Sequence, residues 1–154
     1  MSGSAVSSSA PGGRRRILIV EDETLIAMEL MDIVEDAHGR VVGPVRSNRE
    51  AIHLIERDRI DAALLDLNLA DGDATPSAER LAAAGVPILV CTAGVLPRAM
   101  RMMWPDIPIQ RKPVDPRGLA RALAALFEPA AQAASGAAPT SWRACNIDIG
   151  SPNA

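Results

Sequence analysis

Residues 16–22 read Arg16-Ile17-Leu18-Ile19-Val20-Glu21-Asp22, a short apolar run that ends in two carboxylates. An unbroken run of aliphatic residues is typical of a strand covered on both faces, as in a parallel sheet. Similar runs recur at 62–65 and 86–91. The sequence therefore predicts several parallel strands buried in one core.

Amphipathic stretches with helical spacing separate these runs, and cap signals mark where helices begin. Ser47 followed by Glu50 fits a capping box. Thr75 and Asp115 each precede a proline, which suits an N-cap followed by the first helical position. Alternating strands and helices predict an α/β fold with helices on both faces of a parallel sheet. The expected strands lie at 16–20, 41–45, 62–65, 86–91 and 107–110, the last an edge strand because it contains Pro108.

The chain has 154 residues, of which 48% are apolar and 23% charged, which suits one globular domain. Residues 1–13 and 129–154 are rich in Ala, Pro, Ser and Gly, so we expect flexible tails around a domain at 14–128. The net charge of -3 and the 2% of aromatic residues argue against a nucleic-acid binder.

The two cysteines, Cys91 and Cys145, offer neither a disulfide framework nor zinc-ligand spacing. Cys91 lies inside an apolar run and is interpreted as a small buried hydrophobe rather than a redox sensor. No stretch approaches the ~18 apolar residues of a membrane span, and the first residues lack the apolar core of a secretory signal. These features predict a cytoplasmic protein that does not enter the membrane.

Polar residues follow the expected strands. Glu21 and Asp22 end the first, Asp66 ends the third, Thr92 ends the fourth and Lys112 follows the fifth. In parallel α/β sheets, sites form at the carboxyl ends of the strands, so we expect these side chains to converge. Lys112 is the single Lys among fifteen Arg, and a compact ammonium differs physically from a planar guanidinium.

Three converging carboxylates would repel one another unless a cation neutralised them. Mg²⁺ prefers oxygen ligands and keeps several waters, which leaves room for a phosphoryl oxygen. Asp66 is then a candidate nucleophile that forms an acyl phosphate, with Thr92 and Lys112 contacting the phosphoryl group. Asp66 between two leucines is the hardest residue to explain otherwise, because a carboxylate in an apolar run is costly unless paired.

Taken together, Glu21-Asp22, Asp66, Thr92 and Lys112-Pro113 resemble the receiver domain of two-component response regulators, the CheY-like family. The resemblance covers roughly residues 14–128. It implies a flavodoxin-like three-layer sandwich with a five-stranded parallel sheet of order 2-1-3-4-5. It also implies that the chain is a signalling receiver, not an enzyme beyond its own aspartyl phosphorylation and dephosphorylation.

The same resemblance implies the role of each site residue. Asp66 would be the phosphoacceptor, Asp22 a direct Mg²⁺ ligand and Glu21 a ligand through water. The backbone carbonyl of Asn68 would complete the metal site. Thr92 would be the switch residue that contacts the phosphoryl group, and Lys112 would pair with phosphate. The phosphodonor would be a histidine kinase or a histidine phosphotransfer protein, and the output an unidentified protein partner, with a homodimer left open.

The segment after residue 128 is too short and too polar to fold as an output domain, so we expect a single-domain response regulator. The stretch around Thr92 is also similar to the alphaproteobacterial FAT GUY receivers, but Val90, Cys91, Ala93 and Gly94 depart from their motif. Many receivers carry an aromatic residue three positions before the Lys, where this chain has Ile109.

Other interpretations stay open. Ile109 motivates an alternative, a phosphate sink or constitutive interaction protein without a conventional aromatic switch. A small phosphohydrolase is a third, weaker hypothesis, because no general base is visible. Glu21 and Asp22 could be acids in the first turn of a helix, and Lys112 a solvated loop residue. Thr92 could cap the helix that follows it, and Trp104 could either pack over the sheet or anchor a partner.

Overall fold

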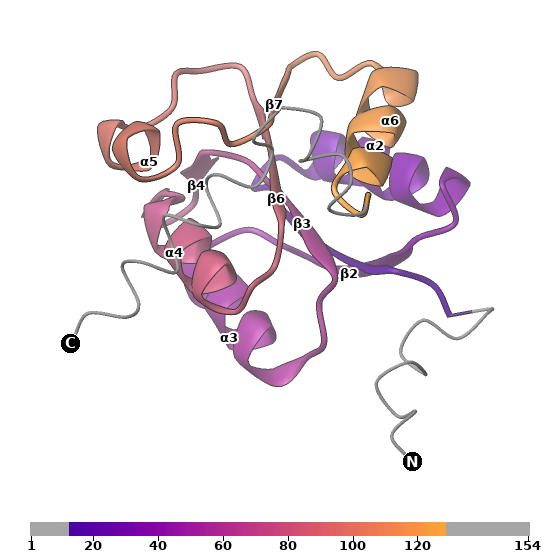
Figure 1. Ribbon diagram of the computed structural model, residues 1–154, viewed down its shortest axis with the longest axis horizontal. Helices are drawn as coiled ribbons and strands as arrows, with labels where there is room; N and C mark the ends of the chain where they lie inside the picture. The colour runs from indigo at the N-terminus through magenta and orange to yellow at the C-terminus, as the bar shows by residue number, and fades with distance from the viewer. Residues whose placement is uncertain (1–12, 129–154) are drawn as a thin grey trace.

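Five parallel strands form the central sheet, in the spatial order β2-β1-β3-β6-β7 (Figure 1). The computed structural model describes residues 13–128. The expected tails at 1–13 and 129–154 therefore lie outside the described residues, apart from Gly13. The strand order confirms the predicted flavodoxin-like sheet. The strands are β1 (Arg16–Val20), β2 (Arg40–Val45), β3 (Ala62–Leu65), β6 (Ile88–Thr92) and β7 (Ile109–Arg111).

Helices cover both faces of this sheet (Figure 1). One core cluster packs beneath α2 and α6, and the other packs beneath α3, α4 and α5. The pleat explains the unbroken apolar runs, because Ile17 and Ile19 face the first cluster while Leu18 and Val20 face the second. The helices are α2 (Thr24–Asp36), α3 (Asn48–Arg57), α4 (Thr75–Ala83), α5 (Arg98–Met103) and α6 (Pro116–Ala125). None of the helices among the described residues is both long and apolar enough to cross a bilayer.

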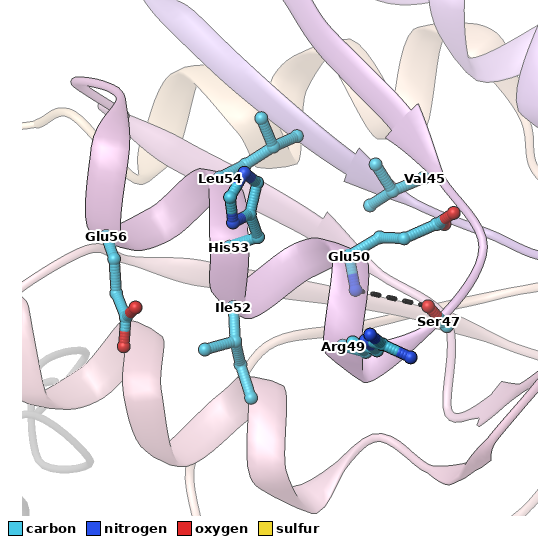
Figure 2. A pocket seen from close by; sticks show the side chains of 8 residues that line it. All are labelled: Val45, Ser47, Arg49, Glu50, Ile52, His53, Leu54 and Glu56. Carbon is cyan, nitrogen blue, oxygen red and sulfur yellow. Dashed lines mark hydrogen bonds between the residues drawn. The ribbon is translucent and has the colours of Figure 1, made fainter.

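The capping box at α3 forms with a small change. The Ser47 hydroxyl accepts a hydrogen bond from the Glu50 N–H at 3.1 Å, as expected (Figure 2). The Glu50 carboxylate accepts from the N–H of Arg46 at 2.8 Å, one residue before the cap. The expected cap of α6 is confirmed, because Asp115 accepts from the Gly118 N–H at 2.7 Å.

The prediction that Thr75 is the N-cap of α4 is wrong. Thr75 is already helical, and Ala74 occupies the cap position without any side-chain hydrogen bond. The carboxylate of Asp73 instead accepts from the Thr75 N–H at 2.8 Å. The proline still lies in the first turn, where its missing N–H costs nothing.

Three strands also differ in extent from the expected ones. β2 begins at Arg40 rather than at 41, β6 covers Ile88–Thr92 rather than 86–91, and β7 covers Ile109–Arg111 rather than 107–110. Prolines explain the later starts of β6 and β7, because Pro87 and Pro108 have no N–H to donate and enter the ladder only through their carbonyls. β7 remains at the edge of the sheet, as predicted.

A two-stranded hairpin that the sequence did not predict lies between β3 and α4. It comprises β4 (Asn68–Leu69) and β5 (Gly72–Asp73), which pair in antiparallel fashion. Gly72 has φ of 127°, a conformation that residues with a Cβ rarely adopt. The hairpin follows Asp66 directly and therefore forms part of the frame around it.

Candidate functional site

The residues that follow the strands are held by backbone hydrogen bonds to neighbouring strands. The Glu21 N–H donates to the Val45 carbonyl and the Asp66 N–H to the Val20 carbonyl, both at 2.9 Å. The Lys112 N–H donates to the carbonyl of Thr92 at 3.0 Å. The polar residues predicted at the strand ends are thus held by the sheet itself and meet at one edge.

Glu21, Asp22 and Asp66 form a carboxylate cluster at this edge. Each offers a ligand oxygen, and these oxygens all lie within 4.8 Å of one another. Glu21 and Asp66 are buried, with 1% and 6% of their surface exposed, while Asp22 is half-buried. Among the described residues no other group of three possible metal ligands converges in this way. An all-oxygen donor set of this kind fits a hard divalent cation such as Mg²⁺.

The cluster opens onto a cavity of about 600 Å³. Its walls combine Asp22 and Asp66 with Asn68 from the β4–β5 hairpin, Thr92 at the end of β6, and Lys112 after β7. The structure therefore brings together every site residue that the sequence predicted, with Glu21 lying deepest in the cluster rather than on the cavity wall.

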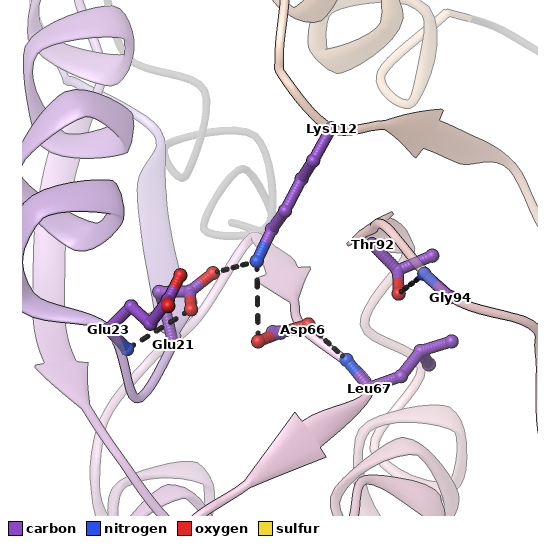
Figure 3. A network of polar contacts seen from close by, with 7 residues as sticks. All are labelled: Glu21, Glu23, Asp66, Leu67, Thr92, Gly94 and Lys112. Atoms are coloured by element: carbon purple, nitrogen blue, oxygen red, sulfur yellow. Dashed lines mark hydrogen bonds and ion pairs between the residues drawn. The ribbon is translucent and has the colours of Figure 1, made fainter.

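Lys112 links two of the three carboxylates (Figure 3). Its ammonium lies 2.8 Å from Glu21 Oε1 and 3.4 Å from Asp66 Oδ2. The other oxygen of Asp66, Oδ1, accepts from the Leu67 N–H at 2.7 Å, and Glu21 Oε2 accepts from the Glu23 N–H at 3.2 Å. The two oxygens of Asp66 thus have different neighbours, and its carboxylate is fixed in orientation.

The electrostatics of the cluster follow from burial and crowding. Burial, the largest cause, and the charge of Asp66 together raise the pKa of Glu21 to about 7, in spite of the hydrogen bond from Lys112 that lowers it. Burial also opposes the Lys112 ammonium, but its hydrogen bond to Glu21 and the charges of both carboxylates give it a net raised pKa. Lys112 is therefore a firmly held cation in a site with an excess of negative charge.

Thr92 is buried at the end of β6 and lines the cavity. Its Oγ accepts from the Gly94 N–H at 2.9 Å and so shapes the loop that follows (Figure 3). The alternative that Thr92 caps the next helix is wrong, because α5 begins at Arg98 and Pro97 occupies its cap position. Cys91 is buried beside it, and burial raises the pKa of its thiol to about 12, as expected for an inert core residue.

A second hollow, of about 760 Å³, is larger but carries different chemistry (Figure 2). It lies along α3 and the end of β2, and it is lined by Arg49, His53 and two glutamates among aliphatic side chains. It contributes no residue to the carboxylate cluster. We therefore take the smaller cavity as the candidate site.

One buried polar residue beside this site was missed by sequence reasoning. Asn48, at the first position of α3, is 6% exposed and hydrogen-bonds to the β4–β5 hairpin. Its neighbour Ser47 carries the capping-box signal, so Asn48 reads as an ordinary first-turn residue. No signal in the single sequence distinguishes it.

A family model for the response regulator receiver domain matches residues 17–107. The chain belongs to this family. The matched receiver segment contains Glu21, Asp22, Asp66 and Thr92, and it ends before Lys112.

Known proteins similar to this receiver support the assignment. SdrG from Sphingomonas melonis Fr1 has a solution structure with 42% identity and a TM-score of 0.64, covering 75% of this chain and 98% of that one. The receiver domain of the sensor histidine kinase PA1611 from Pseudomonas aeruginosa PAO1, with magnesium in its active site cleft, is 26% identical. That match has a TM-score of 0.64 and covers 74% of this chain and 98% of the other.

The curated relatives are longer than this receiver. The transcriptional regulatory protein PdtaR of Mycobacterium tuberculosis is 34% identical over 80 residues, which are 51% of this chain. The same residues amount to 39% of PdtaR, so the chain spans well under half of that relative. The similarity therefore concerns the receiver domain and not the whole of that protein.

Proposed function

We propose that this receiver accepts a phosphoryl group on Asp66 in a Mg²⁺-dependent reaction and thereby switches its interactions with another protein. The observation that carries the proposal is the convergence of Asp66 with two further carboxylates, Thr92 and Lys112 around one cavity. We assign the activity to a receiver unit at 14–128, which contains the whole segment matched by the family model.

The residues at the cavity would divide the work. Asp22, Asp66 and the Asn68 carbonyl would hold Mg²⁺ directly, and Glu21, which lies deeper, would hold it through a water. The bound cation would neutralise the carboxylates and the incoming phosphoryl oxygens. This division agrees with the burial of Glu21 and with the half-exposed position of Asp22.

The transfer itself forms one covalent bond to the protein, at Asp66. An oxygen of Asp66 attacks the phosphorus of a phosphohistidine, the new O–P bond forms and the N–P bond breaks. The electron pair of the broken bond stays on the imidazole, which leaves neutral when its other nitrogen carries a proton. The Lys112 ammonium lies 3.4 Å from Asp66 Oδ2 and stabilises the negative charge of the phosphoryl oxygens as they reach Asp66.

The test is phosphorylation of the intact chain. The protein is incubated with Mg²⁺ and acetyl phosphate, or with a phosphorylated kinase, and its intact mass is measured. We expect one added phosphoryl group on the native chain and none on Asp66→Asn. A matched control is Asp36→Asn, which changes an exposed carboxylate at the far end of α2 and should be labelled normally. Equal labelling of Asp66→Asn would overturn the proposal.

A second candidate function, a phosphate sink without a conventional switch, is favoured by Ile109. This residue is aliphatic and 36% exposed on the edge strand β7, where an aromatic switch residue would be expected from the family. A similar protein, SdrG, has been solved in a BeF₃-activated conformation; that structure is 41% identical, with a TM-score of 0.63.

Nuclear magnetic resonance with and without beryllofluoride separates the two candidates. Beryllofluoride imitates the phosphoryl group on an aspartate. Shifts that extend from Asp66 to Ile109 and α5 would support the switch. Shifts confined to the cavity would support the sink. In either case we propose that this receiver acts in the cytoplasm and takes its phosphoryl group from a histidine kinase or a histidine phosphotransfer protein. The switch would in addition have a downstream protein as its output partner.

A further inference from the structure

A buried amide joins three elements next to the candidate site. Asn48 begins α3, yet its side-chain Nδ2 donates to Asp71 Oδ1 at 3.2 Å and to the Asp73 carbonyl at 2.9 Å. Both acceptors belong to the β4–β5 hairpin region. The start of α3 is therefore attached to the hairpin by a side chain rather than by packing alone.

The oxygen of the same amide serves the next helix. Asn48 Oδ1 accepts from the hydroxyl of Ser77 at 2.6 Å and from its N–H at 3.1 Å, in the first turn of α4. Ser77 is fully buried. Both amide hydrogens and the amide oxygen of Asn48 are therefore used, which only Asn or Gln can do because they alone combine an NH₂ donor with a carbonyl acceptor.

Asp71 returns these contacts from the hairpin turn. Its carboxylate accepts from the backbone N–H of Asn48 at 2.8 Å and from that of Arg49 at 3.1 Å, two groups that the helix itself leaves unpaired. These hydrogen bonds lower the pKa of Asp71. The link between α3 and the hairpin is thus formed in both directions, by a side chain from each.

The hairpin carries the wall of the cavity. In its antiparallel register Asn68 pairs with Asp73, the residue whose carbonyl Asn48 holds. Asn68 lines the cavity and lies two residues after Asp66. The contacts of Asn48 therefore end one cross-strand pair away from the proposed site.

We propose that Asn48 is a positioning residue for this site: it holds the β4–β5 hairpin so that the Asn68 carbonyl faces the carboxylate cluster. The proposal rests on the proposed function insofar as Asn68 supplies a metal ligand. Residues that orient metal ligands from outside the coordination sphere are worth roughly 10–100-fold in metal affinity. Asn48 acts through hydrogen bonds to the hairpin and not on the substrate.

The experiment compares Mg²⁺ affinity with stability in two neighbouring variants. Asn48→Ala removes all the side-chain contacts to the hairpin and to Ser77, and we expect Mg²⁺ to bind about tenfold more weakly. Ser47→Ala removes the adjacent helix cap, whose hydroxyl accepts from Glu50 within α3 (Figure 2). Both variants should lower the urea midpoint, but Ser47→Ala should bind Mg²⁺ like the native chain.

Two further measurements keep the proposal open to refutation. Asn48→Asp retains an acceptor for Ser77 but loses both donors to the hairpin, so it should also bind Mg²⁺ weakly even where Asn48→Ala fails to fold. In the metal-free protein, amide hydrogen exchange at Leu69 should accelerate in Asn48→Asp and not in Ser47→Ala. Native Mg²⁺ affinity together with native exchange in Asn48→Asp would overturn the proposal.

The test of the positioning role of Asn48 can fail or succeed independently of the test of the proposed function. Phosphorylation of Asp66 in the native chain tests the function, whereas the Asn48 variants are compared without any phosphodonor. Labelling of Asp66 with unchanged Mg²⁺ affinity in the Asn48 variants would refute only the positioning role. Weakened Mg²⁺ binding in those variants without labelling of the native chain would refute only the phosphoacceptor function.

Discussion

The ammonium of Lys112 lies 2.8 Å from Oε1 of Glu21, although 91 positions separate the two residues in the chain. Glu21 is buried, and the hydrogen bond from this cation favours its charged form against the effect of burial. The ammonium lies farther from Asp66, at 3.4 Å, and so leaves the candidate phosphoacceptor less tightly paired. The one Lys of a chain with fifteen Arg therefore has two electrostatic tasks at a single site.

Replacing Lys112 by Arg should impair phosphorylation while preserving the fold. A planar guanidinium remains charged, but it cannot place a compact cation between Glu21 and Asp66 in the same space. We expect the rate of labelling by acetyl phosphate to fall by roughly tenfold or more, on the order of the loss of one charge-stabilising contact. Stopped labelling reactions followed by intact mass measure this rate, and circular dichroism checks the fold.

The matched control for Lys112→Arg is Arg111→Lys, the opposite exchange at the neighbouring exposed position. Arg111 donates to the Gly94 carbonyl and not to the carboxylate cluster. The Arg111→Lys variant should therefore be labelled at close to the native rate. A native labelling rate in Lys112→Arg would mean that Arg can replace the single Lys, whose presence would then have no functional reason.

The metal-free protein should lose stability as the pH rises through the range in which Glu21 ionises. The pKa of Glu21 is raised from 4.5 to about 7 in the folded state. The folded state therefore holds this proton more tightly than the unfolded chain, and the contribution is full below about pH 4.5 and lost as the pH approaches 7. Its size is on the order of 3 kcal/mol. Urea unfolding in chelator at several pH values measures it.

Glu21→Gln is the control for this pH dependence, since it removes the titrating group and keeps the shape. It should flatten the stability profile between pH 4.5 and 7. Asp66→Asn should move the native profile to lower pH, because the charge of Asp66 contributes to the raised pKa of Glu21. An unchanged profile in Glu21→Gln would assign the pH dependence to another group.

Mg²⁺ affinity should rise as the pH passes through the pKa of Glu21, about 7. A cation binds the ionised carboxylates, so protons and Mg²⁺ compete for Glu21 and its neighbours. We expect the dissociation constant to fall as the pH passes from 6 to 8, with the largest change near the pKa of Glu21, about 7. Titrations followed by amide chemical shifts measure this dependence. A pH-independent affinity would mean that Glu21 is already ionised at pH 6.

Replacing Thr92 should separate phosphorylation from its consequences. Thr92→Ala removes the acceptor of the Gly94 N–H, a loss of about 1 kcal/mol of stability, and leaves the three carboxylates intact. We expect near-native labelling of Asp66 but smaller beryllofluoride-induced shifts in α5. Thr92→Ser keeps the hydroxyl and should restore those shifts. Beryllofluoride-induced shifts in α5 that are as large in Thr92→Ala as in the native chain would exclude the Thr92 hydroxyl as the group that transmits the change.

Much of this site could be predicted because its residues follow apolar runs directly. The run before Glu21 and the run before Asp66 each specify a buried parallel strand, and the ends of parallel strands meet at one edge. Lys112 could be included because it follows the last strand and is the only Lys. Local pattern and a general rule of topology were sufficient for these residues.

The hairpin and its attachments could not be predicted in the same way. Asn48 bonds to Asp71 across 23 positions, and no periodicity links two polar residues so far apart. The cap of α4 was misassigned because Thr75 before a proline imitates a cap, whereas the carboxylate of Asp73 performs the capping from outside the helix. The contacts of Asn48 exist only once α3, α4 and the hairpin have been brought together, whereas the Asp73–Thr75 hydrogen bond is local and was missed because two capping candidates lie close together.

Trp104 provides the last prediction, on the stability of the α5 side of the core. It is 1% exposed and packs in the larger core cluster, which favours the packing interpretation over a partner anchor. Its indole Nε1 has no hydrogen-bond acceptor among the described residues, and a buried unpaired donor costs about 1–3 kcal/mol. Trp104→Phe removes that cost together with some packing, so we expect the free energy of unfolding to change by only about 1 kcal/mol. Trp104→Ala leaves a large cavity and should cost about 3–5 kcal/mol. Urea unfolding followed by circular dichroism compares the variants, and a loss in Trp104→Phe well above about 1 kcal/mol would show that the indole N–H is paired in solution.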